Sequence, residues 1–98
     1  MRKIIRKPRA EADLIEIWRY LAERSPSAAD RLLDRVEEVS FMLAEYPHAG
    51  RARPELLENL RSFPVESLIV FYTPQGDRID IVRVLSARRD LENQDFSE

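Results

Sequence analysis

The chain has 98 residues, of which 44% are hydrophobic, and its 16 basic and 18 acidic side chains give a formal net charge of -2. A chain of this length forms one domain, buries little more than about 60% of its unfolded surface and leaves no room for a large cofactor cavity, so we expect no cofactor. The charge balance gives no overall electrostatic reason for tight binding to DNA or RNA. The absence of cysteine excludes disulfides and cysteine-based zinc sites, and it suits a cytoplasmic protein.

The charges are unevenly distributed along the chain. Residues 1 to 9 carry five positive charges and no acid, whereas residues 10 to 46 carry nine acids against four bases. We therefore expect an acidic helical side and a basic strand edge. The longest apolar run, residues 68 to 72, is far shorter than the roughly 20 residues of a membrane helix, and the amino terminus lacks the apolar region of a signal peptide.

The first two predicted elements are a strand and a helix. Residues 2 to 7 are predicted to form a short strand, because β-branched Ile4 and Ile5 precede Pro8, which removes a backbone donor. From Arg9 to about Glu23, apolar residues recur at spacings of three and four, which predicts an amphipathic helix. Its apolar stripe consists of Ala10, Leu14, Ile17, Trp18 and Leu21.

A second helix is predicted to begin at Pro26 or Ser27 and to end at Glu45. Ser25 is a suitable N-cap, and proline is tolerated in a first helical turn. Pro47 and Gly50 stop the pattern. The residues expected to face inward are Ala29, Leu32, Leu33, Val36, Val39 and Leu43. Because the turn between the two helices is so short, we expect them to pack antiparallel.

The second half of the chain is predicted to form a sheet. Residues 51 to 59 are expected to be a loop, or a short helical turn around residues 54 to 57. Three strands are predicted at residues 60–65, 68–73 and 78–85, and the Pro74 and Gly76 of the last link suit a hairpin turn. The prediction is therefore one α+β domain over residues 1–98, in which a helical hairpin packs on a small, mainly antiparallel sheet in the order β-α-α-β-β-β.

This order of elements resembles the toxins of the ParE/RelE superfamily of bacterial type II toxin-antitoxin modules, and the resemblance covers nearly the whole chain. In the first helix, Asp13-Leu14 precedes the aromatic Trp18 by about one turn, as in these toxins. The other similar segments are Leu43 to Arg51, Phe71-Tyr72, Val82 to Leu85 and Ala87 to Asp90.

The ribonuclease branch of that superfamily needs groups that this chain largely lacks. Cleaving RNA through a ribose 2′-hydroxyl requires basic residues for charge stabilisation, together with a tyrosine or histidine for proton transfer. The position where that branch usually carries a strand arginine falls near Ile69, and the family's frequent histidine appears here as Ser86. The tail has Phe96 but neither tyrosine nor histidine, and the only histidine, His48, follows the second helix.

The resemblance therefore favours the ParE branch, whose members are regarded as non-enzymatic poisons of DNA gyrase. It implies that a cognate, ParD-like ribbon-helix-helix antitoxin neutralises the protein through a carboxy-terminal segment that folds on binding. The candidate target-binding residues are Arg83, Arg88, Arg89 and Arg61. The candidate antitoxin-binding residues are Trp18, Tyr20, Leu21, Leu56, Leu57, Phe63 and Phe71. DNA contact is expected only through the antitoxin or gyrase.

Other interpretations remain open at this point. The chain could be a ribosome-dependent endoribonuclease that uses Arg61, Arg83 or Arg89 with an unidentified proton donor, or a decayed toxin that retains antitoxin binding and operon repression. Trp18 lies on the apolar stripe and is expected to pack in the core. Neighbouring glutamates can pair with the arginines of residues 51 to 61 at the surface. No metal site is expected, since no second histidine or cysteine joins His48.

Overall fold

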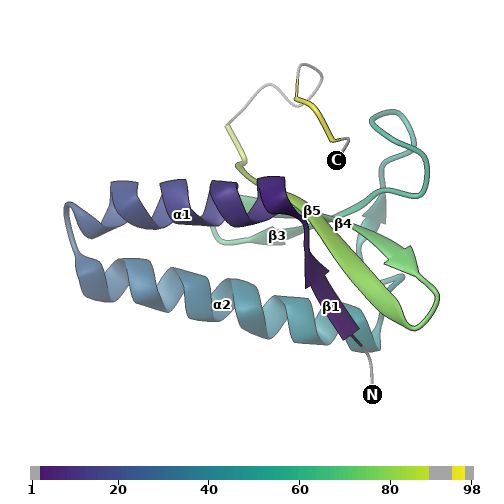
Figure 1. Ribbon diagram of the computed structural model, residues 1–98, viewed down its shortest axis with the longest axis horizontal. Coiled ribbons are helices and arrows are strands. Elements are labelled where there is room, and N and C mark those ends of the chain that lie inside the picture. Colours follow the sequence, from purple (N-terminus) through teal and green to yellow (C-terminus); the bar gives the residue numbers. More distant parts are fainter. Residues whose placement is uncertain (1–2, 89–93, 97–98) are drawn as a thin grey trace.

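A computed structural model of the chain describes residues 3–88 and 94–96. Two helices lie side by side across one face of a sheet (Figure 1). The elements are β1 (Lys3–Arg6), α1 (Pro8–Ala22), α2 (Pro26–Glu45), β2 (Arg51–Ala52), β3 (Arg61–Val65), β4 (Leu68–Gln75) and β5 (Arg78–Ser86). The predicted α+β class and the helical hairpin on one face of a small sheet are confirmed. In the part of the chain that the structure describes, no helix is both long and apolar enough to cross a membrane.

The helices begin close to where the sequence predicts. Helix α1 starts at Pro8, one residue early, because a proline in the first turn has no backbone donor to lose. The predicted cap of α2 is confirmed, since the Ala28 N–H donates to Ser25 Oγ at 3.2 Å. The inward stripe of α2 is buried as expected apart from Leu33, which is only partly buried.

The sheet has five strands in the order β1-β5-β4-β3-β2. Strand β1 pairs with β5 in parallel and the other pairs are antiparallel, so the sheet is mainly antiparallel as predicted. The prediction that residues 51 to 59 contain no strand was wrong. Arg51 and Ala52 pair with Ser62 and Arg61, and a strand of two residues is too short to show an alternating pattern. The helical turn expected nearby is present, since the Leu57 N–H donates to the Arg53 carbonyl.

The last hairpin is tighter than predicted. Strand β4 continues to Gln75 and pairs Pro74 with Ile79, so the turn consists of Gly76 and Asp77 alone. Gly76 has a φ of 62°, a conformation that glycine adopts without steric cost.

A β-bulge interrupts the pairing of β4 with β5. Phe71 pairs with Arg83 and Tyr72 with Ile81, so Val82 is an extra residue on β5. The parallel partner β1 ends at the same level, where Arg6 pairs with Ile81. Beyond Ile81, β1 no longer pairs with β5, so the backbone groups on that edge of β5 can bond to other parts of the chain.

Apolar side chains are buried on both faces of the sheet. Val70 and Tyr72 belong to a cluster with Leu14 and Leu43 of the helices, whereas Phe71, between them on the strand, belongs to a second cluster. Because successive strand residues point to opposite faces, the second cluster lies on the face away from the helices. Its buried members are Leu60, Phe71, Val82, Leu85 and Phe96.

Candidate functional site

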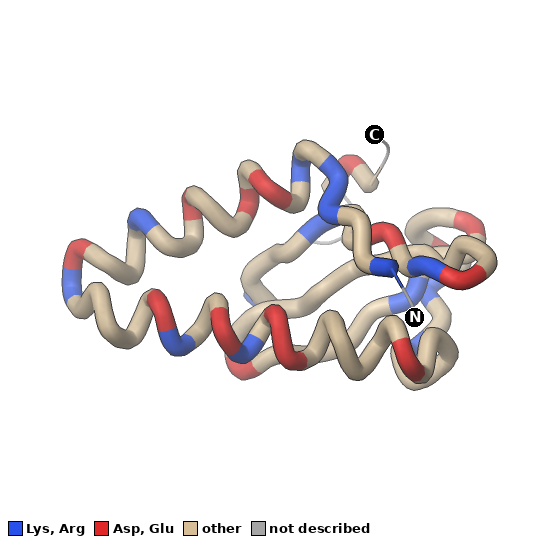
Figure 2. Tube along the Cα trace, turned by 60° about the horizontal axis from the view of Figure 1, so that its bottom comes forward, with Lys and Arg blue, Asp and Glu red and all other residues tan. Residues whose placement is uncertain are grey.

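The basic start of the chain is paired with acidic side chains. Figure 2 shows lysine and arginine gathered where β1 meets α1, while both helices carry charges of both signs. Arg6 pairs with Glu11 at 3.2 Å, and Arg9 pairs with Asp95 at 2.7 Å. The predicted basic edge is therefore present, but much of its charge is balanced within the fold.

Arg83, a predicted target-binding residue, lies inside the structure with only 5% of its surface exposed. Its Nε and Nη2 donate to the Asp13 carboxylate at 2.7 and 3.0 Å, and its Nη1 donates to the Asp95 carbonyl at 2.7 Å. The hydrogen bonds to Asp13 raise the pKa of Arg83 above its usual value. The guanidinium is thus a fixed positive charge whose partners come from distant parts of the chain.

Asp13 holds this arrangement together from helix α1. Besides Arg83, its Oδ2 accepts a hydrogen bond from the Val84 N–H at 3.0 Å. Val84 pairs with Val70 of β4, but it lies beyond Ile81, where the pairing of β5 with β1 ends. The carboxylate therefore completes the sheet edge and neutralises Arg83 at once. The pair Asp13-Leu14 was the sequence signal for this residue, but no sequence pattern indicated that Arg83 was its partner.

The other predicted target-binding arginines differ in their surroundings. Arg88 follows β5 and is exposed, and its backbone N–H donates to Ser86 Oγ at 3.3 Å. Arg89 lies outside the described residues. Arg61 on β3 is partly buried.

Arg61 helps to hold the loop that follows α2. Its Nη1 donates to the carbonyls of Gly50 at 2.6 Å and His48 at 3.3 Å. The Tyr72 hydroxyl donates to the Pro47 carbonyl at 2.7 Å and accepts from the Gly50 N–H at 2.9 Å. Burial raises the pKa of Tyr72 above its usual value, so this phenol stays protonated at neutral pH.

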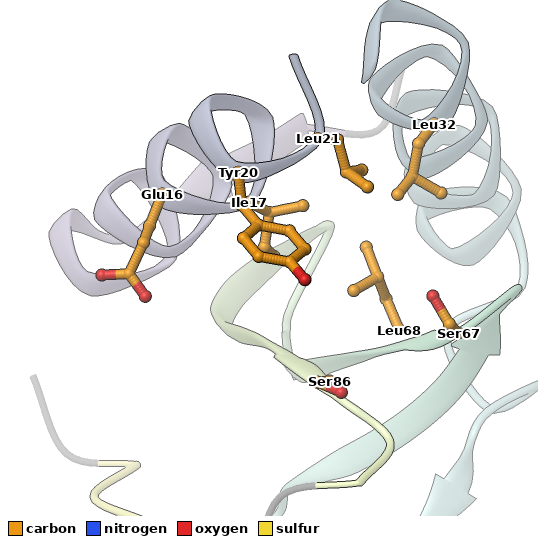
Figure 3. A pocket seen from close by; sticks show the side chains of 8 residues that line it. All are labelled: Glu16, Ile17, Tyr20, Leu21, Leu32, Ser67, Leu68 and Ser86. Atoms are coloured by element: carbon orange, nitrogen blue, oxygen red, sulfur yellow. The ribbon is translucent and has the colours of Figure 1, made fainter. Parts of the chain in front are cut away.

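Two of the predicted antitoxin-binding residues, Tyr20 and Leu21, line a cavity of about 330 Å³. Tyr20 is 60% exposed, and Figure 3 shows its ring beside the opening between α1, the β3–β4 turn and the end of β5. The complete lining is Glu16, Ile17, Tyr20, Leu21, Leu32, Ser67, Leu68 and Ser86. We call this cavity the hairpin groove; it is mainly apolar and has hydroxyl groups along one side.

Trp18 faces a different opening, on the outer side of the helices. It lines a cavity of about 360 Å³ together with Ile15 and Leu33. The indole is partly buried, and its Nε1 donates to Asp30 Oδ1 of α2 at 2.9 Å. The expectation that Trp18 packs in the core was wrong, since the indole is only partly buried and does not belong to the helix-side cluster.

The remaining antitoxin candidates belong to the sheet and its loops. Phe63 packs against the helix-side cluster, whereas Leu56 packs against the cluster on the opposite face. Phe71 has no exposed surface, and its ring centroid lies 4.7 Å from that of Phe96. Leu57 is 38% exposed. The seven candidates thus fall on at least three separate surfaces, and Tyr20 and Leu21 share the hairpin groove.

The contacts of the second sheet face were missed by the sequence analysis. Asp95 and Phe96 return to the sheet beside Arg83 and Phe71. The apolar Phe96 was the only local signal for this return. Within residues 3–88 and 94–96, no three side chains of histidine, aspartate or glutamate gather in a way that could hold a metal ion.

Comparisons with known proteins identify similar chains. A profile of the family described as "ParE toxin of type II toxin-antitoxin system, parDE" matches residues 4–91. The chain is 33% identical over 95 residues to Toxin ParE3 of Caulobacter vibrioides, with 96% of this chain and 95% of that protein covered. It is 32% identical over 95 residues to Toxin RelE3 of the same organism, with 96% and 100% covered. A solved structure described as "Chromosomal ParDE TA system from P. aeruginosa" shares the fold at a TM-score of 0.72 and 22% identity, over 88% of this chain and 96% of that chain.

Proposed function

The chain belongs to the ParE toxin family of type II toxin-antitoxin systems, and from this membership we propose that it is a non-enzymatic poison of DNA gyrase. A protein that traps a topoisomerase on cleaved DNA needs only to bind one conformational state of its target more tightly than the others. A binding surface is sufficient for this, and no proton donor or acceptor is required.

One observation carries the proposal: two arginines that a ribonuclease of this fold would use are bound within the protein itself. Arg83 is held by Asp13, and Arg61 by the backbone carbonyls of the loop after α2. The Tyr72 phenol, a further group that could transfer a proton, is fully buried. Charge stabilisation of an RNA transition state requires cationic groups directed at the substrate. Exposed Arg88 is the described candidate that remains available for an external partner.

Expressing the chain without an antitoxin tests the proposal. We expect induction of the DNA-damage response and, with purified gyrase, accumulation of cleaved DNA covalently bound to the enzyme. Site-specific cuts in messenger RNA with intact DNA would contradict the proposal. A strain whose gyrase is replaced by a different type II topoisomerase is the matched control, because it should tolerate the protein.

An endoribonuclease remains the second candidate, because the chain is 32% identical to a relative named Toxin RelE3. In that case Arg61, Arg83 or Arg89 would stabilise the charge that develops during cleavage. The transcript measurement above distinguishes the two functions directly.

We also propose that a ParD-like antitoxin covers the hairpin groove. An amphipathic helix can place an apolar side chain between Tyr20, Leu21 and Leu68, and the groove has the apolar lining that this mode of binding uses. The groove also includes Ser86, whose hydroxyl accepts the Arg88 N–H. An antitoxin in this groove would therefore lie close to the proposed target-binding arginine.

Replacing Tyr20 with alanine tests this surface. We expect Tyr20→Ala to weaken antitoxin binding at least about tenfold, because exposed tyrosines at the centre of interfaces carry much of the binding energy. Ile15→Ala is the matched control, since Ile15 is 52% exposed on the same helix but lines the other cavity. Binding titrations with the cognate antitoxin measure both variants. Equal affinities for Tyr20→Ala and the unsubstituted protein would exclude the hairpin groove as the main contact.

A further inference from the structure

Helix α1 carries a stripe of exposed side chains on the side turned away from its buried residues. Ile15 lies at the middle of this stripe and is 52% exposed. Glu11 and Arg19, one turn before and one turn after it, are exposed as well. One exposed isoleucine is ordinary at a protein surface, so the indication of a partner lies in its neighbours. We call the set Glu11, Ala12, Ile15, Trp18 and Arg19 the Ile15 stripe.

The Ile15 stripe has the same spacing in both directions from its centre, but with complementary side chains. Glu11 and Arg19 lie at equal distances from Ile15 along the chain and carry opposite charges. Ala12 and Trp18 are also placed symmetrically, and one is small where the other is large. Two copies of α1 that pack antiparallel about Ile15 therefore bring each of these residues to the level of its complement. The stripe is thus complementary to itself.

We propose that the Ile15 stripe binds a second copy of this chain, in a dimer whose α1 helices pack antiparallel about a twofold axis beside Ile15. The two Ile15 side chains then cover each other, and each Trp18 lies at the level of the partner's Ala12. Glu11 of each copy comes within reach of the partner's Arg19, which gives two ion pairs. A twofold contact of this kind uses the same patch on both copies, so it stops at two chains.

The charged residues of the stripe are available for such contacts. Among the residues that the structure describes, Arg19 forms no ion pair. Glu11 accepts from Arg6 at 3.2 Å through one carboxylate oxygen, and a carboxylate can accept several hydrogen bonds. Exposed ion pairs add little affinity, so their main effect is on direction. A parallel arrangement would place Glu11 beside Glu11 and Arg19 beside Arg19, whereas the antiparallel one pairs opposite charges.

The apolar part of the contact sets its strength. Ile15 and Trp18 border the mainly apolar cavity of about 360 Å³ on the outer side of the helices, and contact with a second copy would remove this surface from water. A contact between two single helices is smaller than the roughly 1,600 Å² that standard protein interfaces bury. We therefore expect a weak dimer, with a dissociation constant of about 10–100 μM.

This dimer leaves the hairpin groove open. Tyr20 lies about 140° around the helix axis from Ile15, because each residue of a helix advances by about 100°. The antitoxin and a second copy can therefore be bound to α1 at the same time. The dimer also does not depend on gyrase being the target. Ile15→Ala remains a control for the hairpin groove at concentrations at which the chain is monomeric.

Sedimentation equilibrium of the full chain measures the dimer. Ile15→Glu places two carboxylates beside the twofold axis, and we expect it to weaken association at least about thirtyfold. Leu57→Glu is the matched control and should leave association unchanged. It introduces the same charge at an apolar residue that is 38% exposed, but in the loop between β2 and β3. Thermal unfolding shows whether both variants remain folded.

Exchanging the charges tests the pairing across the axis. Glu11→Arg or Arg19→Glu alone creates two like-charge contacts in the dimer, and we expect each to weaken association at least about tenfold. In an equimolar mixture of the two variants, every introduced charge faces an opposite one, so we expect a mixed dimer with about the original affinity.

The mixture also excludes an effect within one chain. Glu11 lies in the first turn of α1 and Arg19 in the last, where their charges favour the helix dipole. Mixing changes nothing inside either chain, so recovery in the mixture isolates the contact between copies.

The remaining outcomes would overturn the proposal. A chain that stays monomeric up to about 1 mM forms no such dimer. A dimer that Ile15→Glu leaves intact uses another surface, and charge variants that fail to associate when mixed exclude the pairing of Glu11 with Arg19. If the chain is monomeric and Ile15→Glu abolishes antitoxin binding, the stripe is an antitoxin contact instead of a dimer contact.

Discussion

An arginine contributes to binding only if its guanidinium can reach a partner, and the arginines of this protein differ sharply in that respect. Arg83 is buried and bound to Asp13, Arg61 is bound to backbone carbonyls, and Arg88 is exposed after β5. All three look alike in the sequence, since each lies in or beside a predicted strand. Arg83 differs from the other two because its carboxylate partner, Asp13, lies 70 residues away along the chain.

Substituting two of these arginines should separate stability from target binding. We expect Arg83→Ala to lower the free energy of unfolding by about 3–5 kcal/mol, because it leaves the Asp13 carboxylate buried without its cation. Arg88→Ala should change that free energy by less than about 0.5 kcal/mol and yet weaken gyrase poisoning. Urea denaturation followed by circular dichroism measures the first effect, and a gyrase cleavage assay measures the second. A stable Arg83→Ala variant that folds as well as Arg88→Ala would contradict the structural role of the ion pair.

The buried phenol of Tyr72 gives stability an alkaline limit. Burial raises the pKa of Tyr72 in the folded protein above its usual value of 10.0. A raised folded pKa means that the contribution of the neutral phenol is fully present below the unfolded pKa and is lost as the pH rises through the folded pKa. We therefore expect the free energy of unfolding, measured in urea, to fall above about pH 10.

Tyr72→Phe is the matched variant for this pH dependence. It removes the donor to the Pro47 carbonyl and the acceptor of the Gly50 N–H, so we expect a loss of about 1–3 kcal/mol at neutral pH. Its own stability should fall less steeply above pH 10.0, the usual pKa of the group it lacks. Parallel alkaline curves for both proteins would show that another group causes the decline.

At the scale of the elements, the β3–β4 and β4–β5 turns each place one residue in the left-handed backbone region, but with different residue types. In the β4–β5 turn, Gly76 has a φ of 62° and nothing within 4 Å of where a Cβ would be. In the β3–β4 turn, Glu66 adopts a φ of 56° with a full side chain, which is sterically unfavourable.

Exchanging residue types at these turns should change stability in opposite directions. We expect Glu66→Gly to raise the free energy of unfolding by about 0.5–1 kcal/mol, because it relieves the steric cost of the left-handed conformation. Gly76→Ala should lower it by about 1 kcal/mol, since only the backbone conformation is penalised there. Thermal and urea unfolding of the two variants provide the measurement. A loss of stability in Glu66→Gly would mean that the glutamate side chain contributes more than its backbone conformation costs.

Elements in which apolar residues recur at a regular spacing were predictable from the sequence. Elements that depend on pairing with distant residues were not. The apolar stripes predicted both helices, and Ser25 predicted the start of α2 correctly. Strand β2 was missed because its two residues are strand only through their pairing with β3. Gly50 was interpreted as a helix terminator, whereas its structural constraint is the Tyr72 hydroxyl, which would lie 2.5 Å from an added Cβ.

The candidate site was less predictable than the fold, because its residues are placed by contacts between distant parts of the chain. Exposure of Tyr20 opposite the sheet-facing stripe follows from helical spacing. The burial of Arg83 depends on a partner 70 residues away, and that of Phe71 on the return of Phe96. No local pattern connects Asp13 with Arg83, and the only local signal for the return of Phe96 is its own apolar side chain. A bulge that adds Val82 also changes which β5 residues share a face, and simple alternation does not anticipate it.

The whole molecule is a thin plate, with extents of 38 × 33 × 21 Å. The helices cover one face of the sheet and the C-terminal segment covers part of the other, so β4 and β5 lie in the middle of the plate. Val70, Phe71 and Tyr72 have no exposed surface, and Ile81 has 1%. Both apolar clusters meet at these two strands.

Amide hydrogen exchange should follow this arrangement. We expect the amides of the paired central residues of β4 and β5 to exchange only through global unfolding, since they are covered on both faces. Amides of β2 should exchange much faster, because this strand pairs with β3 through two residues. Exchange measured by NMR at native conditions tests this order. Fast exchange in β4 together with slow exchange in the helices would indicate that the helical hairpin, and not the sheet, is the most stable unit.

The hydrogen bond between Trp18 and Asp30 has a practical consequence for studies of this protein. The chain contains a single tryptophan, and its indole lies partly exposed between the two helices with its N–H bonded to α2. Its ultraviolet fluorescence therefore reports on one place alone. Separation of the helices, or binding of a partner over that opening, would change the wavelength and intensity of the emission. Such events can therefore be followed by fluorescence without attaching a label.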